Sequence, residues 1–152
     1  DYKIALADPE VEAVFVLTPN FAHYTVTMDA LRADKHVFCE KPIAMTAAQA
    51  AEFEAFEAAH PEVKIGVCLQ NRMNETTEEL KKIIDSGEYG KVVGIRGFVP
   101  WRRDEKYYQA QPWRGKWKYA GGGSMINQSL HTLDLLYFLG EKAQPAEDFS
   151  AK

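Results

Sequence analysis

Three apolar runs, each of strand length, alternate with helical patterns in the first half of the chain. The runs occupy residues 11–17, 36–40 and 63–69, and β-branched residues are common in them. The segments between them, 20–32 and 46–59, have the spacing of helices. Buried strands joined by helices require right-handed crossovers, so this half predicts a doubly wound parallel sheet of the α/β class.

Residues of the kinds that begin helices stand between these runs. Asn20 follows the first run, and asparagine is favoured at the N-cap, so we expect it to cap the first helix. Thr46 and Gln49 have the spacing of a capping box, which predicts the start of the second helix.

The pattern changes after residue 70. Thr76 and Glu79 have the spacing of another capping box, and Gly87 is expected to end the helix that follows it. Residues 91–101 read as a long strand. We therefore place a domain boundary near Gln70, with an α+β part after it.

A run near the end of the chain, residues 121–136, begins with three glycines and continues as an apolar helical pattern. Asn127, His131 and Asp134 stand in it at positions i, i+4 and i+7, which share one face of a helix. Polar groups there cost free energy unless they are paired or used, so the stripe is a candidate site. His131 is the best acid–base candidate, because the ordinary pKa of histidine lies near neutrality.

A structural interpretation competes with this one. A single histidine on an apolar helix is more often a core residue with satisfied hydrogen bonds, and Asp134 can pair or cap for structural reasons alone. A metal site is not expected, because no second histidine or cysteine stands at ligand spacing. The functional interpretation therefore needs support from other segments.

Polar residues follow each of the three strands. They are Thr18-Pro19-Asn20, Glu40-Lys41-Pro42 and Gln70-Asn71-Arg72. In a doubly wound sheet ligands bind beyond the carboxyl ends of the strands, so these segments predict one shared cleft. Lys41 could hold a hydroxyl or carbonyl oxygen there and stabilise charge on it, with its backbone restricted by Pro42. A solvated lysine is the commoner alternative.

The composition narrows the class of protein. The chain has 152 residues, is 46% hydrophobic and 26% charged, and carries a formal net charge of -4 with no basic stripe. Nucleic acid and an anionic membrane surface are therefore not expected partners, and no apolar run is long enough to cross a membrane. Cys39 and Cys68 lack CxxC spacing and fit reduced thiols in the cytoplasm. Both ends of the chain read as cuts, so we expect a piece of a longer protein.

An aromatic and basic loop precedes the three glycines. It contains Tyr107, Tyr108, Trp113, Arg114 and Trp117. The aromatic residues could present flat faces to a sugar ring or a nicotinamide, and core or interface packing is an equally good account of them. Arg114 could pair with a carboxylate or a phosphate.

Five motifs occur in a fixed order over nearly the whole chain. They are Thr18-Pro19-Asn20-x-x-His23, Glu40-Lys41-Pro42, Gly87-x-x-Gly90-Lys91-Val92, Trp113-Arg114-Gly115-x-Trp117, and Gly121-Gly122-Gly123 through His131 and Asp134. In this order they resemble the Gfo/Idh/MocA family of NAD(P)-dependent oxidoreductases. The Trp-Arg-Gly-x-Trp and Asn-Gln-x-x-His variants look most like the branch that acts on sugars and nucleotide-sugars.

The resemblance implies a partial Rossmann domain over residues 1–69, which binds NAD or NADP, and a partial substrate and oligomerisation domain over residues 70–152. It implies hydride transfer between the nicotinamide and a carbon of a sugar or nucleotide-sugar. Lys41 would anchor the reacting oxygen, and His131 would exchange its proton. Asn127, where the family often has Asp, would orient the substrate rather than transfer a proton.

The resemblance also implies two sets of binding residues. The set for the cofactor is Thr18, Pro19, Asn20, His23, Glu40, Lys41, Pro42, Gln70, Asn71, Trp113 and Arg114. The set for the substrate is Lys41, Tyr108, Asn127, His131 and Asp134.

One family feature is missing from the sequence. The glycine-rich turn G-x-G-x-x-G, which holds the cofactor's pyrophosphate, does not occur in these 152 residues, and the residue that separates NAD from NADP would precede Asp1. We therefore expect the chain to be inactive alone and the whole protein to be a homo-oligomer. Two alternatives stay open: an NAD-dependent, redox-assisted glycoside hydrolase of the same family, and a non-catalytic binding or regulatory homologue.

Overall fold

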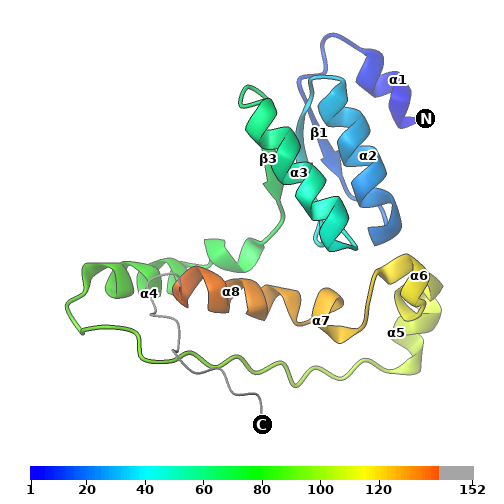
Figure 1. Cartoon of the computed structure of the whole chain (residues 1–152). Helices are drawn as coiled ribbons and strands as arrows, with labels where there is room; N and C mark the ends of the chain where they lie inside the picture. The colour runs from blue at the N-terminus through cyan, green and yellow to red at the C-terminus, as the bar shows by residue number, and fades with distance from the viewer. Residues whose placement is uncertain (141–152) are drawn as a thin grey trace. The chain divides into compact units, whose positions relative to one another are not determined.

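The computed structural model describes residues 1–140, and the chain divides into two compact units, which we describe one at a time (Figure 1). The first unit consists of Asp1–Cys68 and Trp101–Gln128. The second consists of Leu69–Pro100 and Ser129–Lys152, of which the part up to Gly140 is described.

The first unit is built on a parallel sheet of three strands. These are β1 (Ala13–Val16), β2 (His36–Cys39) and β3 (Ile65–Val67), in the order β1-β2-β3. The register pairs Ala13 with His36 across the first two strands, and Val37 with Ile65 across the next two. The predicted parallel sheet is confirmed, and each strand lies inside the apolar run that predicted it.

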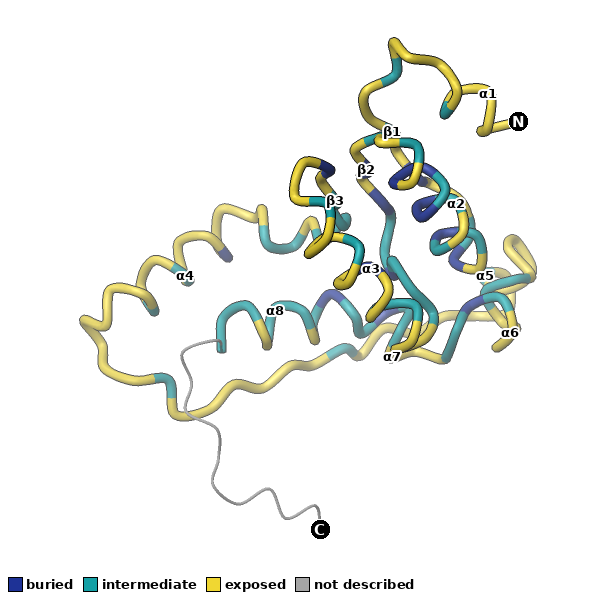
Figure 2. Tube along the Cα trace, turned by 45° about the horizontal axis from the view of Figure 1, so that its top comes forward, coloured by how far each residue is buried: buried dark blue, intermediate teal, exposed yellow. Residues whose placement is uncertain are grey.

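Helices α2 (Asn20–Arg32) and α3 (Ala47–Ala59) connect these strands and supply the core, while α1 (Tyr2–Ala7) precedes β1. The core joins alternate strand positions to the inner sides of both helices. Its buried members are Val16, Met28, Ala30, Leu31, Val37, Cys39, Phe53 and Val63. Figure 2 shows buried positions concentrated on α2 and β2. The side chains that alternate with these positions, Phe15 and Phe38, remain 71% and 40% exposed.

The starts of the two helices differ from each other in how they are capped. Thr46 Oγ1 accepts a hydrogen bond from the Gln49 N–H at 3.2 Å, as the capping box predicts. The prediction for Asn20 is wrong, because Pro19 occupies the N-cap position and Asn20 is the first helical residue. The buried Asn20 amide instead donates to the carbonyl oxygen of Ala120 at 3.0 Å, which ties α2 to a distant segment of the same unit.

Four short elements complete the first unit. They are α5 (Glu105–Ala110), the 3₁₀ turn η2 (Pro112–Gly115), α6 (Trp117–Ala120) and α7 (Ser124–Asn127). Gly121 ends α6 at φ +80°, and a Cβ on it would lie 2.7 Å from the Cβ of Met45. This close approach accounts for the first glycine of the triplet.

The second unit contains the 3₁₀ turn η1 (Gln70–Met73) and helices α4 (Glu75–Ser86) and α8 (Leu130–Gly140). Helix α4 begins at Glu75, so the capping box expected at Thr76 does not form. Gly87 ends it at φ +69°, as predicted. The long strand expected over 91–101 is not formed, because a strand needs a hydrogen-bonded neighbour and none pairs with it among residues 1–140.

The run of residues 121–136 is interrupted, which corrects the prediction of one continuous helix. Helix α7 ends at Asn127, two turn residues follow, and α8 starts at Leu130. Asn127 belongs to the first unit, and His131 and Asp134 belong to the second. The three residues therefore do not form the single helical stripe that their spacing predicted.

Candidate functional site

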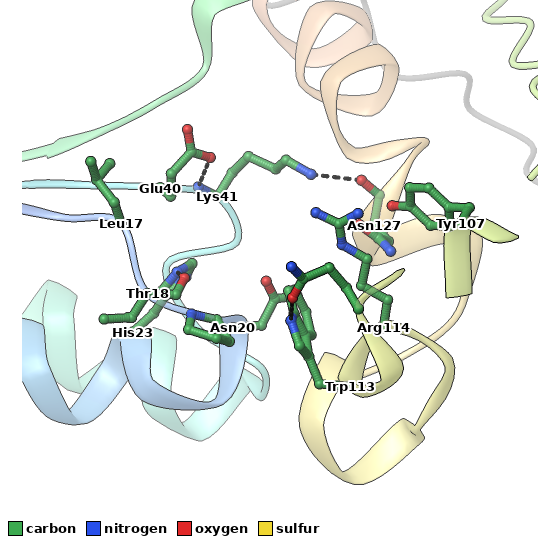
Figure 3. Close-up of a pocket in the computed structure, with 12 residues that line it drawn as sticks. Leu17, Thr18, Asn20, His23, Glu40, Lys41, Tyr107, Trp113, Arg114 and Asn127 are labelled. Atoms are coloured by element: carbon green, nitrogen blue, oxygen red, sulfur yellow. Dashed lines mark hydrogen bonds between the residues drawn. The ribbon is translucent and has the colours of Figure 1, made fainter. Parts of the chain in front are cut away.

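A cavity of about 470 Å³ opens in the first unit at the carboxyl ends of β1 and β2 (Figure 3). It is lined from the first two strand ends, from the α5–η2 segment and from α7. The lining residues are Leu17, Thr18, Pro19, Asn20, His23, Glu40, Lys41, Tyr107, Gln111, Trp113, Arg114 and Asn127. This is the edge of a parallel sheet at which ligands bind, and the polar ends of the first two strands predicted it. The third segment of the predicted cleft, Gln70-Asn71-Arg72, is not among the lining residues.

Lys41 extends from the end of β2 into this cavity (Figure 3). Its Nζ donates a hydrogen bond to the backbone carbonyl oxygen of Asn127 at 2.7 Å, and its backbone N–H donates to Glu40 Oε2 at 3.1 Å. Burial lowers the pKa of the Lys41 ammonium below its ordinary 10.5, and the neighbouring Glu40 carboxylate offsets part of that effect. The result is a half-buried cation whose three N–H donors make one hydrogen bond within the described residues, to the Asn127 carbonyl oxygen.

His23 holds the two strand ends together from beneath the cavity. It is 1% exposed; its Nδ1 lies 2.7 Å from the Pro42 carbonyl oxygen, and its Nε2 lies 2.6 Å from that of Thr18. Carbonyl oxygens only accept, and a neutral imidazole has one N–H, so a neutral ring satisfies one of these contacts at a time. His23 therefore positions the segments that carry Thr18 and Lys41.

Aromatic rings and a guanidinium form the wall opposite the strand ends. The guanidinium carbon of Arg114 lies 4.7 Å from the ring centre of Tyr107 and 5.5 Å from that of Trp113. The Trp113 indole N–H donates to Gln111 Oε1 at 3.0 Å. These contacts hold the guanidinium beside the cavity, where it can meet an anionic or carbonyl oxygen.

In the second unit, the Asp134 carboxylate is bound by Arg72. Arg72 Nε donates to Asp134 Oδ2 at 2.8 Å and Nη2 donates to Oδ1, a two-pronged ion pair between η1 and α8. The same guanidinium lies 4.9 Å from the ring centre of Phe138. Asp134 thus forms an ion pair with a residue outside its own helix, which is the structural role that the sequence left open for it. His131 lies on the same helix and is 8% exposed.

The structure gathers most of the residues that were predicted to bind a cofactor. Those that line the cavity are Thr18, Pro19, Asn20, His23, Glu40, Lys41, Trp113 and Arg114. Pro42 is buried and does not line the cavity. Its carbonyl oxygen lies 2.7 Å from His23 Nδ1. Gln70 and Asn71 lie in η1 of the second unit.

Of the residues predicted to bind substrate, Lys41 and Asn127 line the same cavity, and Tyr108 lines a neighbouring one. Sequence reasoning missed Gln111, which lies outside every motif, and gave no role to Gln128, although the Asn-Gln-x-x-His motif contains it. The place of Gln111 beside the Trp-Arg-Gly motif was the only signal that could have pointed to it.

Sequence comparison identifies the family. Residues 1–68 match the model of the oxidoreductase family with an NAD-binding Rossmann fold, and residues 77–147 match the GFO/IDH/MocA C-terminal domain. The chain therefore belongs to the Gfo/Idh/MocA family, and its parallel sheet is part of the family's Rossmann fold.

Among its relatives are two curated enzymes. Inositol 2-dehydrogenase from Salmonella paratyphi B is 30% identical over 139 residues, which are 91% of this chain and 38% of the relative. The 1,5-anhydro-D-fructose reductase of Ensifer adhaerens is 34% identical over 137 residues, which are 88% of this chain and 39% of the relative. The chain thus spans about two fifths of the length of these relatives.

A solved structure matches this chain over a similar length and at a similar sequence identity. The WlbA dehydrogenase from Bordetella pertussis, in complex with NADH and UDP-GlcNAcA, superposes with a TM-score of 0.83 at 32% identity. The match covers 91% of this chain and 40% of that one. No helix in the described part of this chain is long and apolar enough to span a membrane.

The side chains of the cavity fit one end of a nicotinamide dinucleotide. The Lys41 ammonium and the Arg114 guanidinium supply donors for ribose and amide oxygens, Glu40 supplies an acceptor, and Trp113 supplies a flat face. The set lacks the clustered backbone donors of a glycine-rich turn, so it suits the nicotinamide and its ribose better than the anionic pyrophosphate.

Proposed function

We propose that the protein containing this chain is an oxidoreductase that moves a hydride between NAD or NADP and a carbon of a sugar or nucleotide-sugar. The observation that supports this most directly is Lys41, a half-buried cation at the strand ends of a Rossmann sheet, surrounded by residues of the family motifs. The nicotinamide, when bound, accepts or returns the hydride. The chain's own residues hold the substrate oxygen and handle its proton.

Lys41 is proposed to anchor the reacting oxygen. Its Nζ donates one of its three N–H groups to the Asn127 carbonyl oxygen, which fixes the ammonium, and within residues 1–140 the other two are proposed to serve a ligand. When a carbinol is oxidised its oxygen loses a proton and gains negative charge on the way to the ketone. A fixed positive charge in a site with little water stabilises that oxygen more than water would.

His131 is proposed to exchange the proton of the same hydroxyl, and the Asn127 side chain is proposed to orient the substrate. Histidine suits this role because its ordinary pKa lies near neutrality, so it can accept and release a proton at little cost. His131 is buried on α8, which limits the rotamers open to the ring.

Sugars or nucleotide-sugars are the proposed substrate class. The relatives are named for inositol and anhydrofructose, and the solved neighbour holds a nucleotide-sugar. Aromatic rings beside the cavity suit the apolar faces of sugar rings, and the lysine and arginine suit their oxygens. We further propose a domain boundary near Gln70, a homo-oligomer and a cytoplasmic location, the last because the spacing of Cys39 and Cys68 does not suit a disulfide framework.

The test is NADH formation by the full-length protein against a panel of inositols, sugars and nucleotide-sugars. We expect turnover with at least one compound and a loss of about 10²–10³ in kcat for Lys41→Ala, because a fixed charge at the reacting oxygen is removed. Lys82→Ala is the matched control: Lys82 is 71% exposed and pairs only with Glu79 among the described contacts. It should leave kcat unchanged.

Other outcomes distinguish the alternatives. Release of a sugar from a glycoside without net NADH would indicate redox-assisted hydrolysis, in which the hydride is returned to the substrate. No turnover of either kind, with a biological role that survives Lys41→Ala, would indicate a binding or regulatory protein.

A further inference from the structure

A basic segment of the first unit carries more positive charge than the cavity beside Lys41 uses. Residues 101–118 contain six lysines and arginines and two acidic residues, a net charge of +4 in a chain whose net charge is -4. Of those six cations, Arg114 alone lines the cavity beside Lys41. Arg102 and Arg103 line a different cavity, which we call the arginine cavity.

The arginine cavity has a volume of about 540 Å³ and lies in the same unit as the cavity beside Lys41. Its lining residues are Arg102, Arg103, Asp104 and Tyr107. Tyr107 also lines the cavity beside Lys41, so the two cavities meet at this residue. A ligand whose reacting end lies beside Lys41 can therefore extend past Tyr107 toward the two arginines.

Aromatic rings hold the Arg103 guanidinium at this cavity. Its central carbon lies 5.0 Å from the ring centre of Tyr107 and 5.5 Å from that of Trp101. The guanidinium carbon of Arg114 lies 4.7 Å from the same Tyr107 ring, so one ring contacts a cation of each cavity. Such contacts restrict a guanidinium without giving its N–H groups an oxygen acceptor.

Neither arginine of this cavity forms an ion pair with a carboxylate within residues 1–140. Asp104 is the acid among the lining residues, and its Oδ1 accepts a hydrogen bond from the Tyr107 backbone N–H at 3.1 Å as the N-cap of α5. Arg102 and Arg103 are both exposed, so a ligand can reach them. The cavity therefore offers two adjacent cations, one of them held in place, to an anion from solution.

The chemistry of two adjacent guanidiniums favours a phosphate over the other anionic group common in sugars, a carboxylate. One guanidinium satisfies both oxygens of a carboxylate through a two-pronged contact. A phosphate monoester brings three strong acceptor oxygens and a charge of about -1.5 to -2, which suits two guanidiniums. A sugar hydroxyl carries a proton and no charge, so it gains less from them.

We propose that the arginine cavity binds a phosphate group of the substrate, remote from the reacting carbon, and that Arg103 is its main ligand. The phosphate belongs to a nucleoside diphosphate or to a sugar phosphate. The inference rests on the proposed function, because it takes the cavity beside Lys41 as the place of reaction. It makes Arg103 a residue that selects phosphate-bearing substrates without taking part in hydride transfer.

The test is isothermal titration of the full-length protein, saturated with NAD, with four probes: UDP, uridine, glucose 6-phosphate and glucuronate. We expect UDP to bind at least about tenfold more tightly than uridine, or glucose 6-phosphate at least about tenfold more tightly than glucuronate. The tighter of the two phosphate probes distinguishes a nucleoside diphosphate from a sugar phosphate.

Three variants test the role of the arginine cavity. Arg103→Gln removes the guanidinium and should weaken the tighter phosphate probe about tenfold. Arg96→Gln is the matched control, because Arg96 is an exposed arginine of the second unit and is not among the lining residues; it should leave the affinity unchanged. Asp104→Asn keeps an N-cap oxygen and removes a negative charge, so it should tighten the same probe about two- to fivefold.

Tightening cannot come from misfolding, so Asp104→Asn decides if Arg103→Gln does not fold. Uridine and glucuronate binding as tightly as the phosphate probes, binding of no probe, or an unchanged phosphate affinity in the deciding variant would overturn the inference. Displacement of NAD by the phosphate probe would assign the arginines to the phosphates of the cofactor and would overturn it as well.

The proposed function is judged separately by NADH formation in the same wild-type preparation. Turnover without a phosphate affinity that depends on Arg103 contradicts the phosphate subsite alone. A phosphate affinity that depends on Arg103 without turnover of any compound contradicts the proposed reaction and leaves the arginine cavity as a ligand site.

Discussion

The Lys41 ammonium is half-buried, and its surroundings move its pKa in opposite directions. Burial favours the neutral amine, while Glu40 and the Asn127 carbonyl oxygen favour the ammonium. His23 acts on the same place indirectly, since its ring contacts the backbone on both sides of the cavity. Sequence alone identified both residues as candidates. It could not tell that His23 faces carbonyl groups, because that depends on how the two strand ends meet.

The lowered pKa of Lys41 predicts an early alkaline limit to activity. The ammonium is needed to hold the reacting oxygen, and it is lost as pH rises through a pKa that burial has moved below 10.5. We therefore expect kcat/KM to fall on the alkaline side below pH 10.5. Lys41→Arg keeps a charge to above about pH 12, so it should move this limit upward even if it lowers the rate. An unmoved limit would assign the titration to another group.

Cys39 should be unreactive in the folded protein. It has no exposed surface, and burial raises the pKa of its thiol to about 11. At pH 8 only about one molecule in 10³ then carries the reactive thiolate. Iodoacetamide followed by mass spectrometry should modify the partly exposed Cys68 and leave Cys39 intact until urea is added. Equal modification of the two thiols under native conditions would show that β2 is not packed as described.

At the scale of elements, the sequence predicted the helices and strands that depend on neighbouring residues. It did not predict the features that depend on segments distant in the sequence. The strands β1 to β3 and helix α3 follow from apolar runs and a capping box, which act over a few residues. Residues 91–101 were expected to be a strand, but a strand depends on a neighbour that its own sequence does not specify. The break after Asn127 was missed because its hydrophobic pattern continues across it. Ser129, a type favoured at helix starts, was the available signal.

Two glycines at helix ends separate two contributions to the free energy of unfolding: the backbone conformation and the steric overlap of an added Cβ. Gly87 has φ +69° with open space around it, so Gly87→Ala should cost about 1 kcal/mol from backbone conformation alone. Gly121 has φ +80°, and a Cβ there would lie 2.7 Å from Met45. Gly121→Ala should therefore cost more, about 2–4 kcal/mol.

Urea unfolding of the purified variants measures both changes in the free energy of unfolding. Gly94→Ala is the control, because a Cβ there meets nothing within 4 Å at an unremarkable φ, and it should stay within about 0.5 kcal/mol of the wild type. If Gly121→Ala cost no more than Gly87→Ala, the contact between α6 and the Met45 segment would be looser than described.

At the scale of the whole molecule, the described residues combine a short parallel sheet with the cavity beside Lys41. Its first unit has three parallel strands, and Phe15 and Phe38 on one face of that sheet remain exposed. The chain spans about two fifths of the length of its curated relatives, and the glycine-rich turn that holds a pyrophosphate is absent from its sequence. We therefore propose that the cavity beside Lys41 contacts the nicotinamide end of a cofactor.

We accordingly predict that the 152-residue chain alone binds NAD weakly and transfers no hydride. Most of the affinity for a dinucleotide comes from its charged pyrophosphate, which needs the backbone donors of a glycine-rich turn at a helix start. Isothermal titration of the chain should give a dissociation constant in the millimolar range or weaker, against about micromolar for a complete site. Nicotinamide mononucleotide, with its single phosphate, is the control: its affinity should be close to that of NAD. Micromolar binding of NAD by the chain would mean that the Lys41 cavity suffices, and the prediction would be wrong.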